Sequence, residues 1–275
     1  DSSGTVDEFG YPVGYGKNNQ AVLIPAFLSA YSGKNAENIS LNAITENPLP
    51  NWSVNYSGLI NIDFFKERFK KFSLGHAYRS SYTLNNFKSN LEYNPSNTQL
   101  TDDSGNYINE FLYTNINLVE QFNPLLKIDM ELNNSLQIVM SLKKDRALSL
   151  SLDNNLLTES NGTDYSIGLG YRIKDLKFTN RVGGKRRVSK GDLNIKTDLN
   201  FRDNITIIRN LNIEDNKVTA GQKMWSLKTS ADYNLSKSFN AIFFYDHLFS
   251  KFAISTAFPM TTIRAGMTLR YNFGE

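Results

Sequence analysis

Apolar and polar residues alternate with a period of two over much of this chain, and its last stretch has the pattern most clearly. From Thr262 to Phe273 the sequence reads T-I-R-A-G-M-T-L-R-Y-N-F, so every second residue is apolar and the residues between are polar or glycine. Successive side chains of a β-strand point to opposite faces, so this stretch predicts a strand with one apolar and one polar face. The chain is therefore constrained to a sheet whose two sides differ chemically.

The same terminal stretch resembles the C-terminal recognition strand by which outer-membrane β-barrels are handed to their assembly machinery. The resemblance lies in a polar residue, a glycine and two apolar residues at fixed spacing, with an aromatic residue beyond them. It implies that a barrel-assembly signal is formed by Arg264, Gly266, Leu269, Tyr271 and Phe273. Any amphipathic terminal strand with one glycine can match this order by chance, so the interpretation depends on the rest of the chain.

Composition excludes several classes of protein. The chain has 275 residues, 30 Lys and Arg, 27 Asp and Glu and a net charge of +3, which gives no argument for nucleic acid as a partner. Cysteine is absent, so disulfides and thiolate metal sites are excluded. No catalytic, cofactor or metal motif is present, so we expect no enzyme activity, no cofactor and no metal site.

The sequence also bears on membrane location and on processing. No apolar run approaches the roughly 20 residues of a transmembrane helix, so a membrane location would require strands. The chain begins Asp1-Ser2 without an initiator methionine, which predicts a mature product or a fragment of a longer chain.

Residues 1–50 lack the alternation and form the first of two expected regions. The stretch Ala21 to Tyr31 is apolar and predicts a short helical turn beginning near Pro25. The sequence N-P-L-P, Asn47 to Pro50, breaks regular structure and closes the region. We interpret it as an irregular segment in a lumen or over a rim, or as an ordinary loop with one buried helical turn.

Residues 51–275 predict an all-β fold of about fourteen antiparallel strands, each near the length that crosses a bilayer when tilted. Asn85-Asn86 predicts a two-residue turn that pairs Leu84 with Phe87. Between Leu126 and Leu142 a three-residue loop, Asn133 to Ser135, would pair Ile128 with Met140 and keep the apolar residues on one face.

Loop lengths favour a transmembrane barrel with a periplasmic C-terminus over a soluble sandwich, because barrels have short turns at one end and longer loops at the other. The short periplasmic turns are expected at Asn123-Pro124, Lys143 to Asp145, Lys174-Asp175, Arg202-Asp203 and Ser236 to Ser238. The longer outer loops are expected at Asn94 to Ile108, Thr158 to Thr163, Gly183 to Gly191, Asn212 to Gly221 and Ser250 to Pro259. The Asn133 loop is an exception to this rhythm. The basic loop Gly183 to Gly191 would contact lipopolysaccharide phosphates or lie in solvent.

Each face of the predicted sheet has its own candidate residues. The polar residues expected to line a lumen are Arg79, Arg172, Lys196, Asp198, Lys228, Asp232, Arg264 and Arg270. The residues expected to face lipid or its interface are Trp52, Tyr78, Tyr82, Leu169, Tyr171, Trp225 and Tyr233. A soluble β-sandwich that binds glycans or proteins would show the same periodicity with the apolar face as its core, so this alternative stays open.

Two internal stretches, Leu49 to Leu59 and His76 to Tyr93, together with Thr268 to Phe273, resemble the C-terminal region of the SprA family. These proteins are the giant outer-membrane translocons of the Bacteroidetes type IX secretion and gliding-motility system. The resemblance covers most of the chain from Ile24 onward. It implies that this chain is the tail of a much larger single-chain barrel that lies in outer-membrane lipid and is closed by the rest of the same polypeptide.

The same resemblance implies a function in protein transport and a set of partners. Folded substrate proteins with C-terminal sorting domains would pass through the lumen to the cell surface. A plug protein would seal the empty pore, and a smaller barrel protein at a lateral opening would receive the substrate. The alternative is a self-contained barrel of about fourteen strands that transports small apolar molecules.

Overall fold

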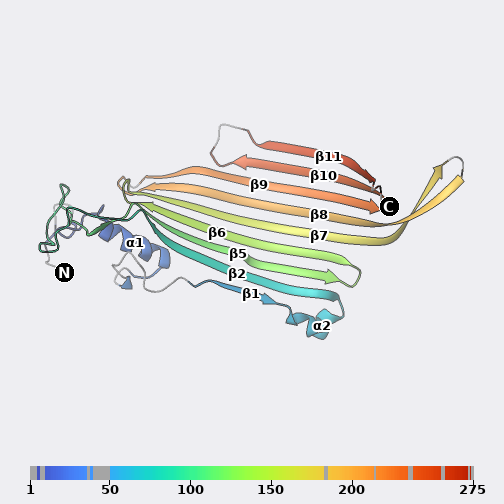
Figure 1. Ribbon diagram of the computed structural model, residues 1–275, viewed down its shortest axis with the longest axis horizontal. Helices are drawn as coiled ribbons and strands as arrows, with labels where there is room; N and C mark the ends of the chain where they lie inside the picture. Colours follow the sequence, from blue (N-terminus) through green and yellow to red (C-terminus); the bar gives the residue numbers. More distant parts are fainter. Residues whose placement is uncertain are drawn as a thin grey trace.

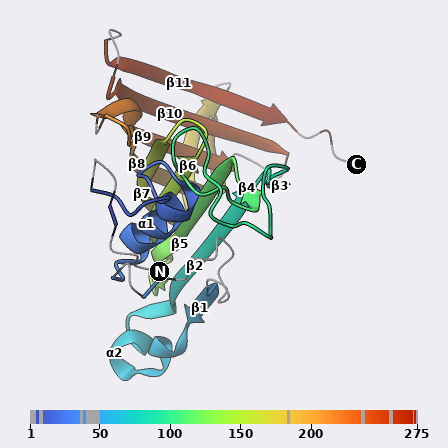
Figure 2. The same cartoon turned by 90° about the vertical axis from the view of Figure 1, so that its left-hand side faces the viewer.

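The computed structural model describes residues 5–6, 10–35, 38–39, 50–182, 185–213, 215–234, 238–254, 258–271 and 273, and for residues 178, 180–182, 185–187 and 189 it describes the backbone alone. Most of the chain forms one antiparallel sheet of nine strands in the order β1-β2-β5-β6-β7-β8-β9-β10-β11 (Figure 1). The direction of the strands turns markedly between β2 and β11 (Figure 2), as the twist of β-sheets requires. The fold is therefore all-β, as the alternation predicted.

The strands of this sheet are β1 (Trp52–Tyr56), β2 (Phe69–Asn85), β5 (Asn115–Leu132), β6 (Leu136–Ser151), β7 (Leu156–Val182), β8 (Lys185–Asn210), β9 (Asp215–Asn234), β10 (Phe239–Phe252) and β11 (Met260–Tyr271). A separate two-stranded ribbon pairs β3 (Lys88–Ser89) with β4 (Phe111–Leu112). The helices are α1 (Gln20–Ser32), the 3₁₀ turn η2 (Gly58–Asn61) and α2 (Asp63–Lys66). None of the helices in the described ranges is both long and apolar enough to cross a membrane.

The prediction of about fourteen short strands was wrong, because several predicted turns lie inside longer strands. β7 has 27 residues and β8 has 26. The predicted loop Thr158 to Thr163 belongs to β7, and four predicted short turns lie within strands β5 to β8: Asn123-Pro124, Lys143 to Asp145, Lys174-Asp175 and Arg202-Asp203. Two of these turns survive only as β-bulges, where the register shifts between Phe122 and Leu126 and between Ile173 and Leu176.

Of the two predicted hairpin loops, one is confirmed. Ile128 pairs with Met140 across the loop Asn133 to Ser135, and Ser135 takes the positive φ of 68° that such a loop requires. Asn86 also has a positive φ, 53°, but the predicted pairing of Leu84 with Phe87 was wrong. Leu84 pairs with Ile116 of β5, and the chain leaves the sheet after Asn86 to form β3, a long loop and β4.

The loops fall at the two ends of the sheet with unequal lengths. At the end where β11 finishes, the chain passes from β5 to β6, from β7 to β8 and from β9 to β10; at the other end it passes from β2 to β5, from β6 to β7, from β8 to β9 and from β10 to β11. The Asn133 loop therefore lies at the same end as the other short connections and is no exception to the expected separation of short turns from longer loops. The β7–β8 hairpin extends past its neighbours at the end that carries the C-terminus (Figure 1).

This topology corrects the position of the basic stretch Gly183 to Gly191. Lys185 to Gly191 form the first part of β8, at the end of the sheet opposite the longer connections, and Gly183 lies outside the described residues together with Gly184. Of the predicted turn Ser236 to Ser238, only Ser238 is described.

Helix α1 begins earlier than predicted because Asn19 caps it. The Asn19 side chain accepts a hydrogen bond from the Ala21 N–H at 2.8 Å, and Gly33, with φ 65°, ends the helix. Pro25 therefore lies inside the helix rather than at its start. The helix packs on one face of the sheet at the end away from the C-terminus (Figures 1 and 2).

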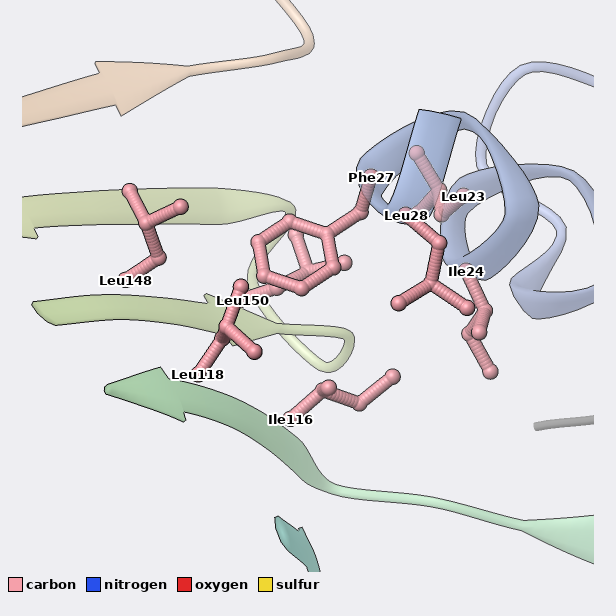
Figure 3. Close-up of a cluster of buried hydrophobic side chains, with 8 residues drawn as sticks. All are labelled: Leu23, Ile24, Phe27, Leu28, Ile116, Leu118, Leu148 and Leu150. Atoms are coloured by element: carbon pink, nitrogen blue, oxygen red, sulfur yellow. The ribbon is translucent and has the colours of Figure 1, made fainter. Parts of the chain in front are cut away.

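The best-buried core of the molecule lies between α1 and the sheet. Figure 3 shows the apolar side chains of α1 directed toward those of β5 and β6. The members of this cluster are Leu23, Ile24, Phe27, Leu28, Ile116, Leu118, Leu148 and Leu150, each no more than 9% exposed. The rest of the sheet has no second layer over it among the described residues, so most of its apolar side chains remain exposed.

Candidate functional site

The strand registers assign each side chain to one of two faces, because directly opposed residues of an antiparallel pair point to the same side. One row that crosses eight strands is apolar except for one histidine: Leu74, Ile128, Met140, Ile167, Leu199, Leu227, His247 and Ile263. We call the face that carries this row face A. The adjacent row, on the opposite face B, is Ser73, Asp129, Val139, Gly168, Asp198, Lys228, Asp246 and Arg264.

Face A carries an apolar band that is shorter than the strands. On β7, β8 and β9 the band covers residues 165–173, 193–201 and 225–233, in which every face-A side chain is apolar, aromatic or threonine. A tilted strand needs about nine to eleven residues to cross a bilayer, and the band has this length on each of the three strands. Leu169 and Leu199 within it are 42% and 44% exposed.

An aromatic row marks the boundary of this band toward α1. Its members occupy successive register positions on four neighbouring strands: Tyr165, Phe201, Trp225 and Phe249. A second group of aromatic residues continues this boundary on face A near the β1 edge of the sheet. There the Tyr78 ring lies 4.5 Å from the Trp52 ring and 4.8 Å from the Phe122 ring. Aromatic girdles at both water interfaces are typical of transmembrane barrels.

A charged row follows immediately beyond the aromatic row on face A. Lys144, Thr163, Asp203, Lys223 and Lys251 are opposed to one another across β6 to β10, one step closer to α1 than the aromatic side chains. Lys223 Nζ lies 3.0 Å from Asp203 Oδ2. At the opposite limit of the band lie further aromatic residues: Tyr171, Tyr233, Phe239 and Tyr271. Face A is thus layered along the strand direction.

Face B is organised differently, by complementary charges between neighbouring strands. Asp198, Lys228, Asp246 and Arg264 alternate in sign along one row across β8 to β11. Arg264 Nη2 lies 3.0 Å from Asp246 Oδ2, and on β7 and β8 Arg202 Nε lies 3.4 Å from Asp164 Oδ1. Opposed charges of unlike sign stabilise a sheet, each pair by about 0.2 to 1 kcal/mol.

All eight residues predicted to line a lumen lie on face B. Arg172 bonds to Asp192, Asp232 accepts from Asn240 Nδ2 at 2.6 Å, and Asp198 lies opposite Gly168. A Cβ atom on Gly168 would meet Asp198 Oδ1 at 3.0 Å, so glycine leaves room for this carboxylate. The others occupy register positions on the same face: Arg79, Lys196, Lys228, Arg264 and Arg270.

All seven residues predicted to face lipid or its interface lie on face A, but they are not equally exposed. Trp52, Leu169 and Tyr171 are exposed, and Trp225 is half-buried. The Tyr82 side chain packs against the α1 core, so α1 covers it. Tyr78 and Tyr233 are buried, and the hydroxyl of each donates a hydrogen bond. Tyr78 donates to Glu120 at 2.5 Å, and Tyr233 donates to the Leu176 carbonyl at 3.1 Å.

The predicted assembly residues lie on or next to β11, which forms one edge of the sheet. Leu269 and Tyr271 extend face A beside β10, and Arg264 belongs to face B. A Cβ atom on Gly266 would lie 2.7 Å from Phe244 Cζ, so the Phe244 ring packs over the glycine and would have to move if a side chain were added. Phe273 is 94% exposed, and its ring centroid lies 4.7 Å from that of Tyr271.

Sequence reasoning missed an ionic cluster on face A beneath α1. Glu159 lies 2.9 Å from Arg209 Nη2 and 3.6 Å from Arg146 Nε, although these positions have the parity of the apolar face. The hydrogen bond from Arg209 is the main cause that lowers the pKa of the Glu159 carboxyl, at a position beyond the apolar band. Burial and a hydrogen bond with Glu120 raise the pKa of the Tyr31 phenol, which stays protonated at neutral pH.

The signal that could have revealed this cluster was present, because Glu120, Arg146, Glu159 and Arg209 are charged residues at face-A positions of β5 to β8. No group of three His, Asp or Glu side chains in the described part of the chain is arranged to hold a metal ion. A comparison with protein-family models and one with curated proteins each gave no match to this chain.

Proposed function

We propose that this chain is the C-terminal part of the wall of a protein-conducting outer-membrane translocon of the type IX secretion system. Face A contacts lipid, face B lines the conduit, and the C-terminus is periplasmic. Folded substrate proteins with C-terminal sorting domains pass along face B to the cell surface. The observation that carries the membrane part of this proposal is the order of rows on face A: apolar band, aromatic row, charged row.

That order is difficult to reconcile with a soluble sandwich. The core face of a sandwich is covered by a second sheet, whereas the band on face A is uncovered and includes side chains such as Leu199 and Leu269 that are 44% and 54% exposed. Soluble proteins rarely expose apolar patches of this extent. A bilayer covers such a band and leaves the aromatic and charged rows at its water interface.

The unequal edges of the sheet favour a larger barrel over a self-contained one. β11 has 12 residues and only β10 as a neighbour, whereas β1 at the other edge has 5 residues. Pairing these two edges would leave most of β11 without backbone partners, which is costly in lipid. Strands from the rest of the same polypeptide would supply them. The resemblance to the SprA family also brings a plug protein, a smaller barrel protein at a lateral opening and gliding motility into this proposal.

Cysteine substitution with spin labelling tests the membrane assignment, and the chain has no cysteine of its own. Leu199→Cys and its neighbour Asn200→Cys would carry nitroxide labels in the intact polypeptide in native outer membranes. We expect the label at Leu199 to relax with oxygen, which partitions into lipid, and the label at Asn200 to relax with a water-soluble nickel chelate. Shielding of the Leu199 label from both reagents would indicate a protein core and overturn the proposal.

Photo-crosslinking tests the transport assignment separately. A photoreactive amino acid at Asn200 or Lys228 on face B should capture a secreted substrate protein during export, whereas one at Leu199 on face A should not. Export must remain active in these strains, so that substrate is in transit when the light is applied. Equal capture from both faces, or none from face B during normal export, would rule out face B as the conduit wall.

A further inference from the structure

A half-open cavity of about 520 Å³ lies between α1 and face A. Its roof comes from Phe27, Ala30 and Tyr31, and its floor is formed by leucines of β6 and β7, among them Leu148 and Leu157. Ala26 and Ala30, one turn apart on α1 and both exposed, also line the cavity, where their small side chains leave it open. A volume of this size is typical of small-molecule sites.

One wall of the cavity has an excess of positive charge. Lys17, Arg146 and Arg209 line it with a single carboxylate, that of Glu159. Glu159 accepts a hydrogen bond from Arg209 at 2.9 Å, whereas its contact with Arg146 is an ion pair at 3.6 Å. Arg146 Nε is buried and lacks a hydrogen-bond partner within the described residues. Two guanidinium groups on one carboxylate leave N–H donors for a further anion.

The apolar floor and the cationic wall together define the ligand. We propose that this cavity binds a single-chain anionic amphiphile, whose carboxylate or phosphate accepts hydrogen bonds from Arg146 and Arg209. Its acyl chain lies against Leu148, Leu157 and Phe27. A fatty acid and a lysophospholipid share this chemistry. The ligand enters from the bilayer, because the cavity lies on face A just beyond the charged row.

The inference rests on the proposed function in one respect only, namely that a bilayer on face A supplies the ligand. The role of the cavity would be to fasten α1 to face A when the amphiphile is present, since Arg146 also stacks 5.6 Å from the Tyr31 ring centroid of α1. Binding of the amphiphile in the cavity therefore depends on lipid beside α1 and does not depend on transport of a substrate. Hydrogen exchange of α1 provides a readout of this role.

Photoaffinity labelling of the intact polypeptide in lipid nanodiscs tests the proposal. The probe is palmitate with a diazirine in its chain, and competitors are oleate, oleoyl-lysophosphatidylglycerol, oleyl alcohol and inorganic phosphate. We expect labelling to map to α1 and β6 and to be displaced by the two anionic amphiphiles. Displacement by one of the two identifies the natural headgroup. Equal displacement by oleyl alcohol, or displacement by phosphate alone, would overturn the amphiphile proposal.

Matched variants separate the cavity from its surroundings. Ala30→Phe should fill the cavity and reduce labelling about tenfold, whereas Ala21→Phe on the same helix, away from the cavity, should not. Arg146→Gln with Arg209→Gln should also reduce labelling about tenfold, with Arg202→Gln on face B as control. Unchanged labelling in both cavity variants, with α1 still protected from exchange, would refute the site.

The outcomes also separate this inference from the proposed function. Labelling at α1 together with spin labels that detect no lipid on face A would leave the cavity valid and remove the membrane assignment. Lipid contact on face A without labelling at α1 would leave the membrane assignment valid and refute the cavity as a lipid site.

Discussion

The two faces of this sheet are made by the same strands and are ordered in perpendicular directions. Face A changes along the strands, from apolar band to aromatic row to charged row, and stays similar from one strand to the next. Face B changes from strand to strand, with charges of alternating sign. A layered environment imposes order along a strand, whereas water requires only that neighbouring charges complement each other. The contrast therefore supports a bilayer on one side and water on the other.

The largest effect is expected where α1 covers face A. Phe27→Ala would remove a buried ring from the α1 core and destabilise the packing of the helix by about 3 to 5 kcal/mol. Hydrogen exchange of residues 20–32 should accelerate while the exchange of β8 and β9 stays unchanged. Phe244→Ala, which truncates an exposed ring on face B, serves as control. Equal effects from both substitutions would mean that α1 does not depend on this contact.

The second prediction challenges the difference between the faces directly. Leu199→Arg would put a charge into the middle of the apolar band and cost about 2 to 4 kcal/mol if lipid surrounds it. Its neighbour Asn200→Arg points to face B and should be nearly neutral. The amount of assembled protein in outer membranes, and its urea midpoint in lipid vesicles, measure both. Tolerance of arginine at both positions would remove the distinction between face A and face B.

A third prediction concerns pH at the ionic cluster beneath α1. The pKa of the Glu159 carboxyl is lower in the folded chain than its value near 4.5 in the unfolded chain. Its ion pairs therefore stabilise the folded state fully at pH above 4.5, and this stabilisation is lost as the pH falls through the lower pKa of the folded state. We expect α1 protection to decrease on acidification below about pH 4.5, by on the order of 1 kcal/mol. Glu159→Gln should weaken α1 at neutral pH and abolish this pH dependence. An unchanged acid response in that variant would assign it to another group.

The smallest effect is expected on face B. In the Asp246–Arg264 pair the Arg264 side chain is 69% exposed and the Asp246 side chain 26%. A double-mutant cycle with Asp246→Asn and Arg264→Gln should give a coupling below about 1 kcal/mol that shrinks with salt. A coupling of several kcal/mol, insensitive to salt, would indicate that this row is desolvated. That result would contradict a wet face B.

How far the sequence could predict this molecule follows from what alternation encodes. The parity of residues separated the eight polar candidates from the seven apolar or aromatic ones, and the strand registers place the two sets on faces B and A, since a one-residue slip would exchange the faces. The ends of strands were poorly predicted, because turn-like pairs such as Lys174-Asp175 are absorbed by bulges or remain extended. The aromatic and charged rows depend on registers across five strands, which no local pattern specifies. The α1 cavity depends on contacts between residues far apart in the chain.

The order of the strands has a consequence for the path by which this molecule acquires its structure. From β5 to β11 each strand pairs with the next along the chain, so the sheet can grow by successive hairpins with little loss of chain entropy. Helix α1 is different, because it reaches Tyr113 from Gln20, 93 residues away, and Lys17 reaches Asn212 across 195 residues. We expect α1 to dock last, onto strands already formed, and a chain shortened by residues 1–50 to build the same sheet at nearly the same rate.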